Sequence, residues 1–265
     1  MNTFILKLYE GYVFFHRFRF LQNNHTRRAD KLVKQREALR NEIELLRRKR
    51  KRSAEEELSL ENLKVTYDRI AATYDQLYPP RSAGIMPTKF GNILKASEAY
   101  SGTRYGIDAV EFWPRLLHVI PPSYRQTIED SRNELSFLVN MSTLSVIFYY
   151  LCVLAILTNA PLFPDWARVL ENSFRYIAAG GFAWCCNWFF HRAAILSVSD
   201  FGRMIRSAYD LFRLDLLEQF HLKPPKDSVE EFQVWRNLGE LIVLGQESLE
   251  FEPLKYEIRK DTKKK

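Results

Sequence analysis

The chain is poor in the residues from which disulfide frameworks, metal sites and phosphate-binding loops are built. Its 265 residues include three cysteines, five histidines and ten glycines. Cys185 and Cys186 are neighbours in sequence and make a poor disulfide pair, and we expect all three cysteines to act as small apolar side chains. The histidines show no metal-ligand spacing, and neither an HExxH sequence nor a phosphate-binding loop occurs. The sequence therefore predicts no metal and no cofactor.

The first 22 residues also lack the pattern of a secretory signal peptide. Lys7, Glu10 and Arg17 interrupt the apolar stretch, and no small-residue cleavage site follows it. The same charges exclude a membrane span there. Aromatic residues flanked by arginine suit a helix that lies in the membrane interface, and packing against another helix of the protein is the alternative.

Charge is absent from one long stretch, residues 135–159. None of its 25 positions holds Asp, Glu, Lys, Arg or His. A helix of 25 residues rises about 37 Å, enough to cross the ~30 Å hydrocarbon core of a bilayer with some tilt. We predict a transmembrane helix here, ended by Pro161 and Pro164.

A second apolar segment, residues 176–190, is shorter. Its fifteen uncharged positions span a bilayer only if Phe174 and residues 193–198 extend it. Its small residues permit close helix packing, and Asn187 is placed to hydrogen-bond with Asn140 across the pair. We predict a transmembrane hairpin over residues 134–199, with a re-entrant second segment as the alternative.

The basic residues around this hairpin indicate its orientation. Five flank its open side and two lie in the connecting loop: Arg125, Arg132, Arg192, Arg203 and Arg206 against Arg168 and Arg175. Because loops rich in Lys and Arg stay in the cytoplasm, we expect both termini to be cytoplasmic.

Residues 23–78 have the pattern of two helices with narrow apolar seams. Leu32, Leu39 and Leu46 recur every seven residues, and a second seam steps by three and four through Leu60, Leu63, Tyr67, Ile70, Tyr74 and Leu77. We predict two coiled-coil-like segments, folded back or continuous through Ser53. Residues 32–77 then serve a protein partner or homo-oligomerisation.

The first of these helices is strongly basic. Residues 23–52 hold 12 basic and 4 acidic residues and end in a cluster formed by Arg47, Arg48, Lys49, Arg50, Lys51 and Arg52. Such a cluster attracts anionic lipid head groups at about 1 kcal/mol per basic residue. Nucleic acid is the less favoured partner, because no aromatic residues interleave these charges to stack on bases. We therefore predict a membrane-surface basic patch; the alternative is a solvated helix face without a specific partner.

Residues 79–133 mix small, apolar and polar residues, and form the predicted cytosolic motif region. Pro87 and Thr88 indicate the start of a helix that Ser101 and Gly102 break. We predict a structural or functional polar network that consists of Asn92, Glu98, Arg104, Tyr105, Asp108 and Arg115. A catalytic interpretation uses Glu98, Asp108, Glu111 or His118 as acid and base, but carboxylates near an arginine are more often structural.

Three strings in this region resemble the shared core of a family of uncharacterised bacterial multi-pass membrane proteins. They are Pro87-Thr88-x-x-Gly91-Asn92-x-x-x-Ala96-x-Glu98-x-Tyr100, Arg104-Tyr105-Gly106-x-Asp108-Ala109 and Trp113-Pro114-Arg115-Leu116. In that family two hydrophobic segments follow, then a helix similar to Tyr209-Asp210-Leu211-x-Arg213-x-x-Leu216, a proline pair and a tryptophan, as in residues 79–240 here. The resemblance implies a bacterial inner membrane and no established activity.

After the hairpin, the sequence pattern of residues 200–252 predicts two cytosolic helices. The second begins at a capping box formed by Ser228 and Glu231, and packs on residues 87–119. Residues 253–265 predict a mobile basic tail.

Together these patterns predict an all-α membrane protein: a transmembrane helical hairpin, cytosolic coiled-coil-like helices and a small helical juxtamembrane domain. The favoured function is a non-enzymatic membrane anchor or assembly factor. One alternative is an oligomeric channel or membrane-permeabilising effector, lined by Asn140, Ser142, Ser145 and Asn187. The other is a membrane-interface enzyme.

Overall fold

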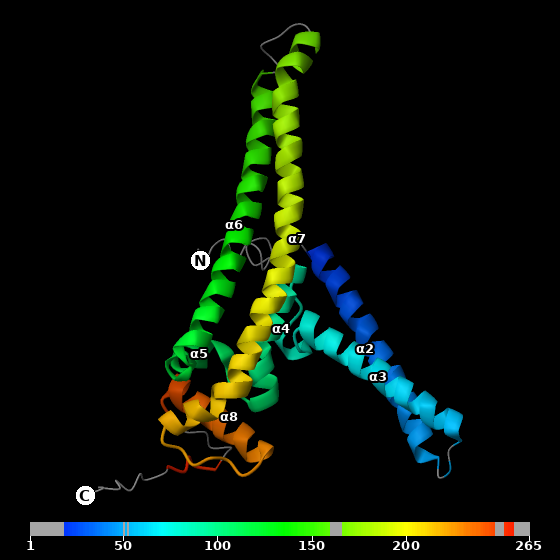
Figure 1. Cartoon of the computed structure of the whole chain (residues 1–265), viewed down its shortest axis with the longest axis vertical. Coiled ribbons are helices and arrows are strands. Elements are labelled where there is room, and N and C mark those ends of the chain that lie inside the picture. The colour runs from blue at the N-terminus through cyan, green and yellow to red at the C-terminus, as the bar shows by residue number, and fades with distance from the viewer. Residues whose placement is uncertain (1–18, 50, 52, 160–165, 247–251, 257–265) are drawn as a thin grey trace, which may run out of the picture.

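The computed structural model describes residues 19–49, 51, 53–159, 166–246 and 252–256. All regular secondary structure longer than a single bridge in these residues is helical (Figure 1). No β-strand occurs among these residues; their one bridge pairs Leu222 with Tyr256. Most of the predicted interfacial helix (residues 1–22), most of the predicted tail (253–265), and positions Arg50 and Arg52 of the basic patch lie outside the described residues.

Helices α2 (Arg19–Arg48) and α3 (Ala54–Leu77) run antiparallel and form a projecting hairpin that we call the arm (Figure 1). Ser53 and Glu56 start α3 with a reciprocal capping box, which turns the chain back on itself. The two helices share a buried cluster formed by Ala29, Val33, Tyr74 and Tyr78, and Leu32 and Leu77 of the predicted seams pack against it. Ile43 and Leu60 are also buried in the arm, whereas Leu39 and Leu46 are only partly buried.

Helices α6 (Pro122–Asn159) and α7 (Trp166–Gln219) pack along each other over most of the length of α6 (Figure 1). α7 is one continuous helix of 54 residues, so its apolar segment does not turn back. Between the helices, the Ser142 hydroxyl donates a 2.7 Å hydrogen bond to Asn187 Oδ1. The expected partner of Asn187, Asn140, is exposed instead.

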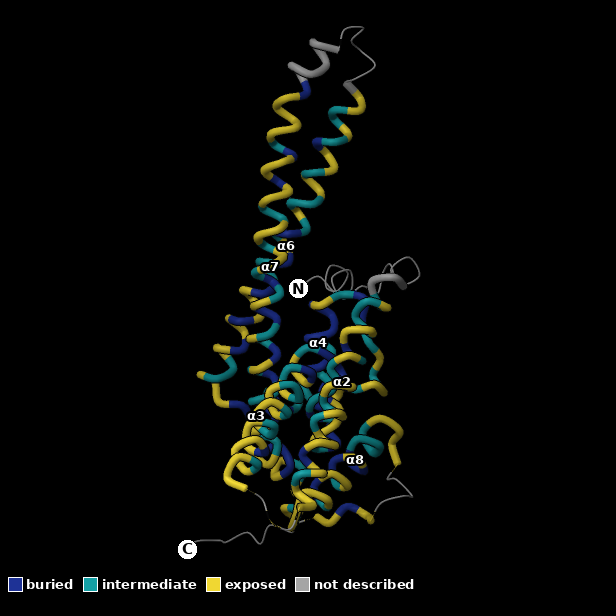
Figure 2. Tube along the Cα trace, turned by 90° about the vertical axis from the view of Figure 1, so that its right-hand side faces the viewer, coloured by how far each residue is buried: buried dark blue, intermediate teal, exposed yellow. Residues whose placement is uncertain are grey.

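One helix among the described residues is long and apolar enough to cross a membrane. It covers Pro122–Thr158, with a mean hydropathy of 2.0 over an 18-residue window of which only 11 % is buried by the rest of the protein. α7 does not pass the same test of length and composition. Figure 2 shows, however, that the upper parts of both helices are largely exposed, whereas buried residues concentrate lower in the molecule.

The body of the protein is built from α4 (Lys89–Tyr105), α5 (Ala109–Val119), α8 (Ser228–Leu244) and the C-terminal half of α7. Its core centres on Phe112, Tyr209 and Trp235, all at most 1 % exposed. The Phe112 and Trp235 rings meet edge to face, 5.3 Å apart. A second core, from α4, α6 and α7, contains Phe90, Leu135 and other buried apolar residues and joins the body to the α6–α7 pair.

Two predicted element boundaries are wrong. Helix α4 continues past Ser101 and Gly102 and ends at Gly106, whose φ of 79° suits a glycine. Helix α8 is capped by Asp227, whose carboxylate accepts from the backbone N–H groups of Val229 and Glu230. Glu231, the expected member of the capping box, is buried and pairs with Arg213 instead.

Candidate functional site

Three of the six predicted polar residues form hydrogen bonds with backbone groups of their own helix or of the adjoining turn. Asn92 is fully buried and makes three 2.8 Å hydrogen bonds, with the backbone N–H and carbonyl of Met86 and the carbonyl of Thr88. Asp108 is the N-cap of α5. Arg115 donates a 2.6 Å hydrogen bond to the Glu111 carbonyl one turn earlier. These contacts are structural, and none of them joins the three residues to one another.

Arg104 and Tyr105 belong to a different group, which meets at Asp210 on α7. The Tyr105 hydroxyl donates a 2.6 Å hydrogen bond to Asp210 Oδ1. The Tyr100 hydroxyl lies 3.0 Å from Asp210 Oδ1 and 3.1 Å from Oδ2, and accepts a 3.2 Å hydrogen bond from Arg104. One carboxylate therefore holds two phenols from α4.

Three arginines surround these tyrosine rings. The Arg213 guanidinium lies 4.1 Å from the centre of the Tyr105 ring, and that of Arg206 lies 5.3 Å from the Tyr100 ring. Arg104 is within 5.8 Å of both rings. We call the six residues the tyrosine–arginine cluster: Tyr100, Arg104, Tyr105, Arg206, Asp210 and Arg213.

The phenols of this cluster are hydrogen-bond donors and remain protonated. Burial, followed by the hydrogen bond to Asp210, raises the pKa of Tyr105 well above its ordinary value. The same two causes, in the same order, raise the pKa of Tyr100. Acid–base chemistry near neutral pH is therefore not what these hydroxyls supply; they fix the position of the Asp210 carboxylate.

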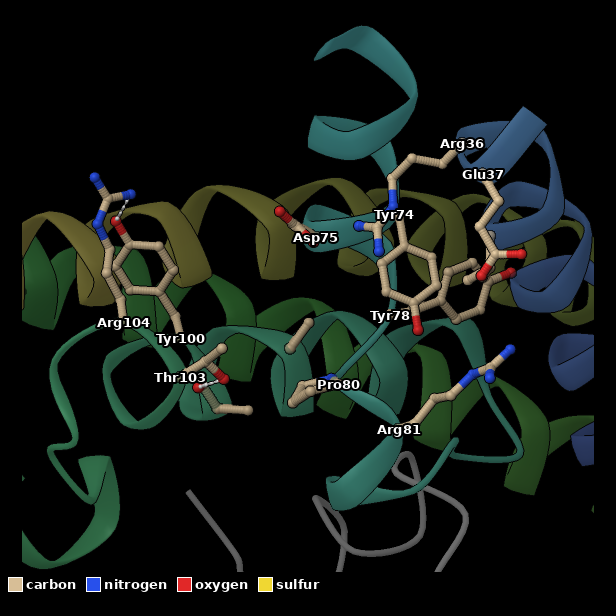
Figure 3. A pocket seen from close by; sticks show the side chains of 13 residues that line it. Arg36, Glu37, Tyr74, Asp75, Tyr78, Pro80, Arg81, Tyr100, Thr103 and Arg104 are labelled. Atoms are coloured by element: carbon tan, nitrogen blue, oxygen red, sulfur yellow. Dashed lines mark hydrogen bonds between the residues drawn. The ribbon is translucent and has the colours of Figure 1, made fainter. Parts of the chain in front are cut away.

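Next to the cluster, an open pocket of about 640 Å³ separates the arm from α4 (Figure 3). Its wall on the arm side carries Tyr74, Asp75 and Tyr78, while Tyr100 and Arg104 form the far end in this view. Arg206 Nη2 donates a 2.9 Å hydrogen bond to the Asp75 carbonyl and thereby connects the end of α3 to α7. The pocket offers aromatic faces together with the guanidinium groups of Arg36, Arg81 and Arg104 and the carboxylates of Glu37 and Asp75, so its lining carries charges of both signs.

The residues of the catalytic interpretation are not assembled into one site. Glu98 lies half-buried on the wall of a separate apolar pocket with Asp108 near it, whereas His118 lines another hollow beside Asp215 and Glu218. Glu111 is exposed in the first turn of α5. No group of three or more His, Cys, Asp or Glu side chains fit to hold a metal ion occurs in the described part of the chain.

The described part of the basic patch lies at the turn of the arm, the end of the arm remote from the exposed apolar part of α6 and α7 (Figure 1). Arg47 and Arg48 are exposed there, and Lys49 pairs with Glu56 at 2.6 Å. This position does not favour contact with the membrane that the α6–α7 pair would cross.

Sequence reasoning missed Tyr100, Arg206, Asp210 and Arg213 as site residues. Tyr100 was present in the motif of α4, and Asp210 and Arg213 were present in the similar pattern after the hairpin. Their meeting depends on how α4 packs on α7, which spacing along the chain does not reveal.

No family model, no curated protein and no solved structure matches the chain. The functional argument therefore rests on the geometry of the chain itself, and the resemblance to the bacterial membrane family stays a prediction.

Proposed function

We propose that this protein is a two-pass anchor or assembly factor of a bacterial inner membrane, with α6 and α7 crossing the bilayer and the arm and body in the cytosol. The observation that carries the proposal is the row of large exposed apolar side chains on both helices. On α6 it includes Phe137, Leu144, Phe148, Leu151 and Leu154, and on α7 it includes Ile177, Phe182, Trp184, Trp188 and Phe189. In water, so large an apolar surface favours association or aggregation, and lipid is the medium that removes this cost.

Both termini are cytoplasmic in this proposal. Five arginines flank the open side of the pair, against two on the side of the connecting loop. The test uses a chain without its natural cysteines, with single cysteines at partly exposed Lys64, exposed Gln126 or within residues 160–165. A membrane-impermeant maleimide applied to intact cells should label only the last of these. Labelling of Lys64→Cys would refute the orientation.

The arm is the part through which this anchor acts. Because Ile43, Leu60 and Tyr74 already fill the seam, a partner or a second copy meets the outer faces of the arm. Those faces carry three large exposed apolar side chains: Leu45 is 66 %, Leu58 65 % and Val65 50 % exposed. Leu58 and Val65 are seven residues apart on α3 and therefore share a face.

The test compares two double variants of equal added charge. Leu58→Asp with Val65→Asp should shift the particle obtained by gentle detergent extraction to the mass of a single chain. Ser59→Asp with Thr66→Asp, at exposed polar positions of α3 that lie about 100° further around the helix, should leave the mass unchanged. If the Leu58→Asp, Val65→Asp variant still forms a homo-oligomer, this face is not the interface between copies. If the wild-type homo-oligomer conducts ions in liposomes, the channel function is favoured over the anchor function.

A further inference from the structure

A small apolar pocket of about 250 Å³ lies between α4, α5, α6 and α7, away from the tyrosine–arginine cluster. Leu94, Trp113, Leu135 and Phe201 form much of its wall, and the exposed Val110 stands among its lining residues. A volume of about 250 Å³ lies just below the usual range of about 300–1,000 Å³ for ligand pockets and suits an aliphatic chain.

Glu98 is the one ionisable residue among those that line this pocket. Its nearest cation is Lys95, with 4.0 Å between Nζ and Oε2, which is too long for a hydrogen bond. Within the described part of the chain, no hydrogen-bond donor contacts the Glu98 carboxylate. Burial raises the pKa of Glu98, Asp108 raises it further, and Lys95 only partly opposes them. The carboxylate thus has one long ion pair and no hydrogen-bonded cation.

The pocket lies at the boundary between the body and the proposed membrane-crossing pair. Leu135 is the first residue of the uncharged run on α6, and Phe201 follows the apolar part of α7 by about three turns. The Glu98 side chain is 36 % exposed, so its carboxylate is reachable from solvent while the rest of the lining is apolar.

We propose that this pocket binds an amphiphile from the bilayer that bears a primary ammonium group, with its aliphatic chain against the apolar lining and its ammonium donating to Glu98. The aliphatic chain of the ligand covers Leu94, Trp113 and Phe201 and so removes apolar surface from water. Its ammonium group forms the hydrogen-bonded ion pair with Glu98 that Lys95 does not form. The bilayer as source rests on the proposed anchor function.

The probe for this site is decylamine with a diazirine at the end of its chain, applied to the full-length protein in nanodiscs. We expect photoadducts within α4, α5 and the Phe201 turn of α7. Unmodified decylamine should compete, whereas decyl sulfate should not, because its anionic head meets a carboxylate. Equal competition by decyl sulfate or decanol would overturn the ammonium assignment.

The variant Glu98→Gln should reduce labelling at least about tenfold, the usual loss for a charge-assisted hydrogen bond. Glu111→Gln removes an exposed carboxylate on α5 and should label as the wild type does. Val110→Trp at the exposed rim should block the chain, and unchanged melting temperatures establish that each variant folds. Full labelling of Glu98→Gln would refute the proposal.

Acidification should abolish labelling as Glu98 gains its proton, with Lys95 and Asp108 the other titratable groups that face it. A different measurement tests the proposed anchor function: it is refuted if membrane flotation shows that the protein does not insert into the bilayer. Glu98-dependent labelling of the detergent-solubilised protein would then still support the pocket.

Discussion

The Tyr105 hydroxyl donates a 2.6 Å hydrogen bond to Asp210 Oδ1 and so joins the last turn of α4 to the middle of the C-terminal half of α7. Tyr100, one and a half turns earlier, reaches the same carboxylate. The arm depends on this joint, because Arg206, whose guanidinium lies over the Tyr100 ring, holds the end of α3 through the Asp75 carbonyl. The Asp210 carboxylate and its neighbours therefore contribute to the position of the arm relative to α7, beside the packing of Leu77 on the second core.

Removing that carboxylate should loosen the joint. Asp210→Ala leaves both phenols without their acceptor, and we expect the free energy of unfolding to fall by about 1–2 kcal/mol, the lower part of the range for hydrogen bonds to a charge, since Asp210 is exposed. Tyr105→Phe should cost about half as much. Denaturant unfolding in detergent measures both, and Asp215→Ala, an exposed carboxylate on the same helix, is the control.

The ion pair of Arg213 and Glu231 joins α7 to α8 at 2.7 Å, with side chains 18 % and 11 % exposed. Because the pair is largely buried, Glu231→Gln leaves an uncompensated guanidinium, and we expect a loss of about 3 kcal/mol. The double variant Arg213→Met with Glu231→Leu should recover much of that loss, since it removes both charges. A double variant as unstable as the single one would contradict this account of the pair.

Glu98 should make stability fall as pH rises. Burial raises its pKa, so the folded protein keeps the proton above the ordinary value of 4.5 at which the unfolded chain loses it. The stabilising contribution of that proton is complete below pH 4.5 and disappears as pH rises through the folded-state pKa. Melting temperatures measured upward from pH 4 should show this decline in the wild type and in Glu111→Gln, but not in Glu98→Gln.

The arm should unfold without the body. Ile43 and Leu60 are each 7 % exposed and lie in the seam, so Ile43→Ala should cost the arm about 2–4 kcal/mol. Limited proteolysis of this variant should cut within α2 and α3 and spare α4 to α8. The matched variant Leu45→Ala, at a 66 % exposed position two residues away, should resist as the wild type does. Simultaneous cutting of the body would show that the arm is not an independent unit.

The sequence predicted those features that depend on neighbours along the chain. The uncharged run marked α6, and the three-and-four spacing from Leu60 to Leu77 identified the side of α3 that is turned away from solvent. Thr88 was recognised as the start of a helix, and in the structure its hydroxyl accepts from the Gly91 N–H. Each of these signals lies within a few residues of what it determines.

Positions where a local rule competes with a distant partner were predicted less well. Glu231 fits a capping box three residues after Ser228, yet its carboxylate bonds Arg213 from another helix, and Asp227 caps α8 instead. Helix α4 ends at Gly106, where a Cβ would come within 2.7 Å of the Phe232 carbonyl, so the packing of α8 requires glycine there.

What the sequence determined by itself is the all-helical character of the described chain, its apolar segment and the sides of its helices that avoid water, because periodicity and the lack of charge act through local geometry. Only the tertiary structure decided that α2 folds back on α3, that Asn187 pairs with Ser142, and that Tyr100 and Tyr105 share Asp210. The hydrogen bonds among these contacts join residues 45 to 110 positions apart, and they form only when packing of the apolar faces brings the helices together.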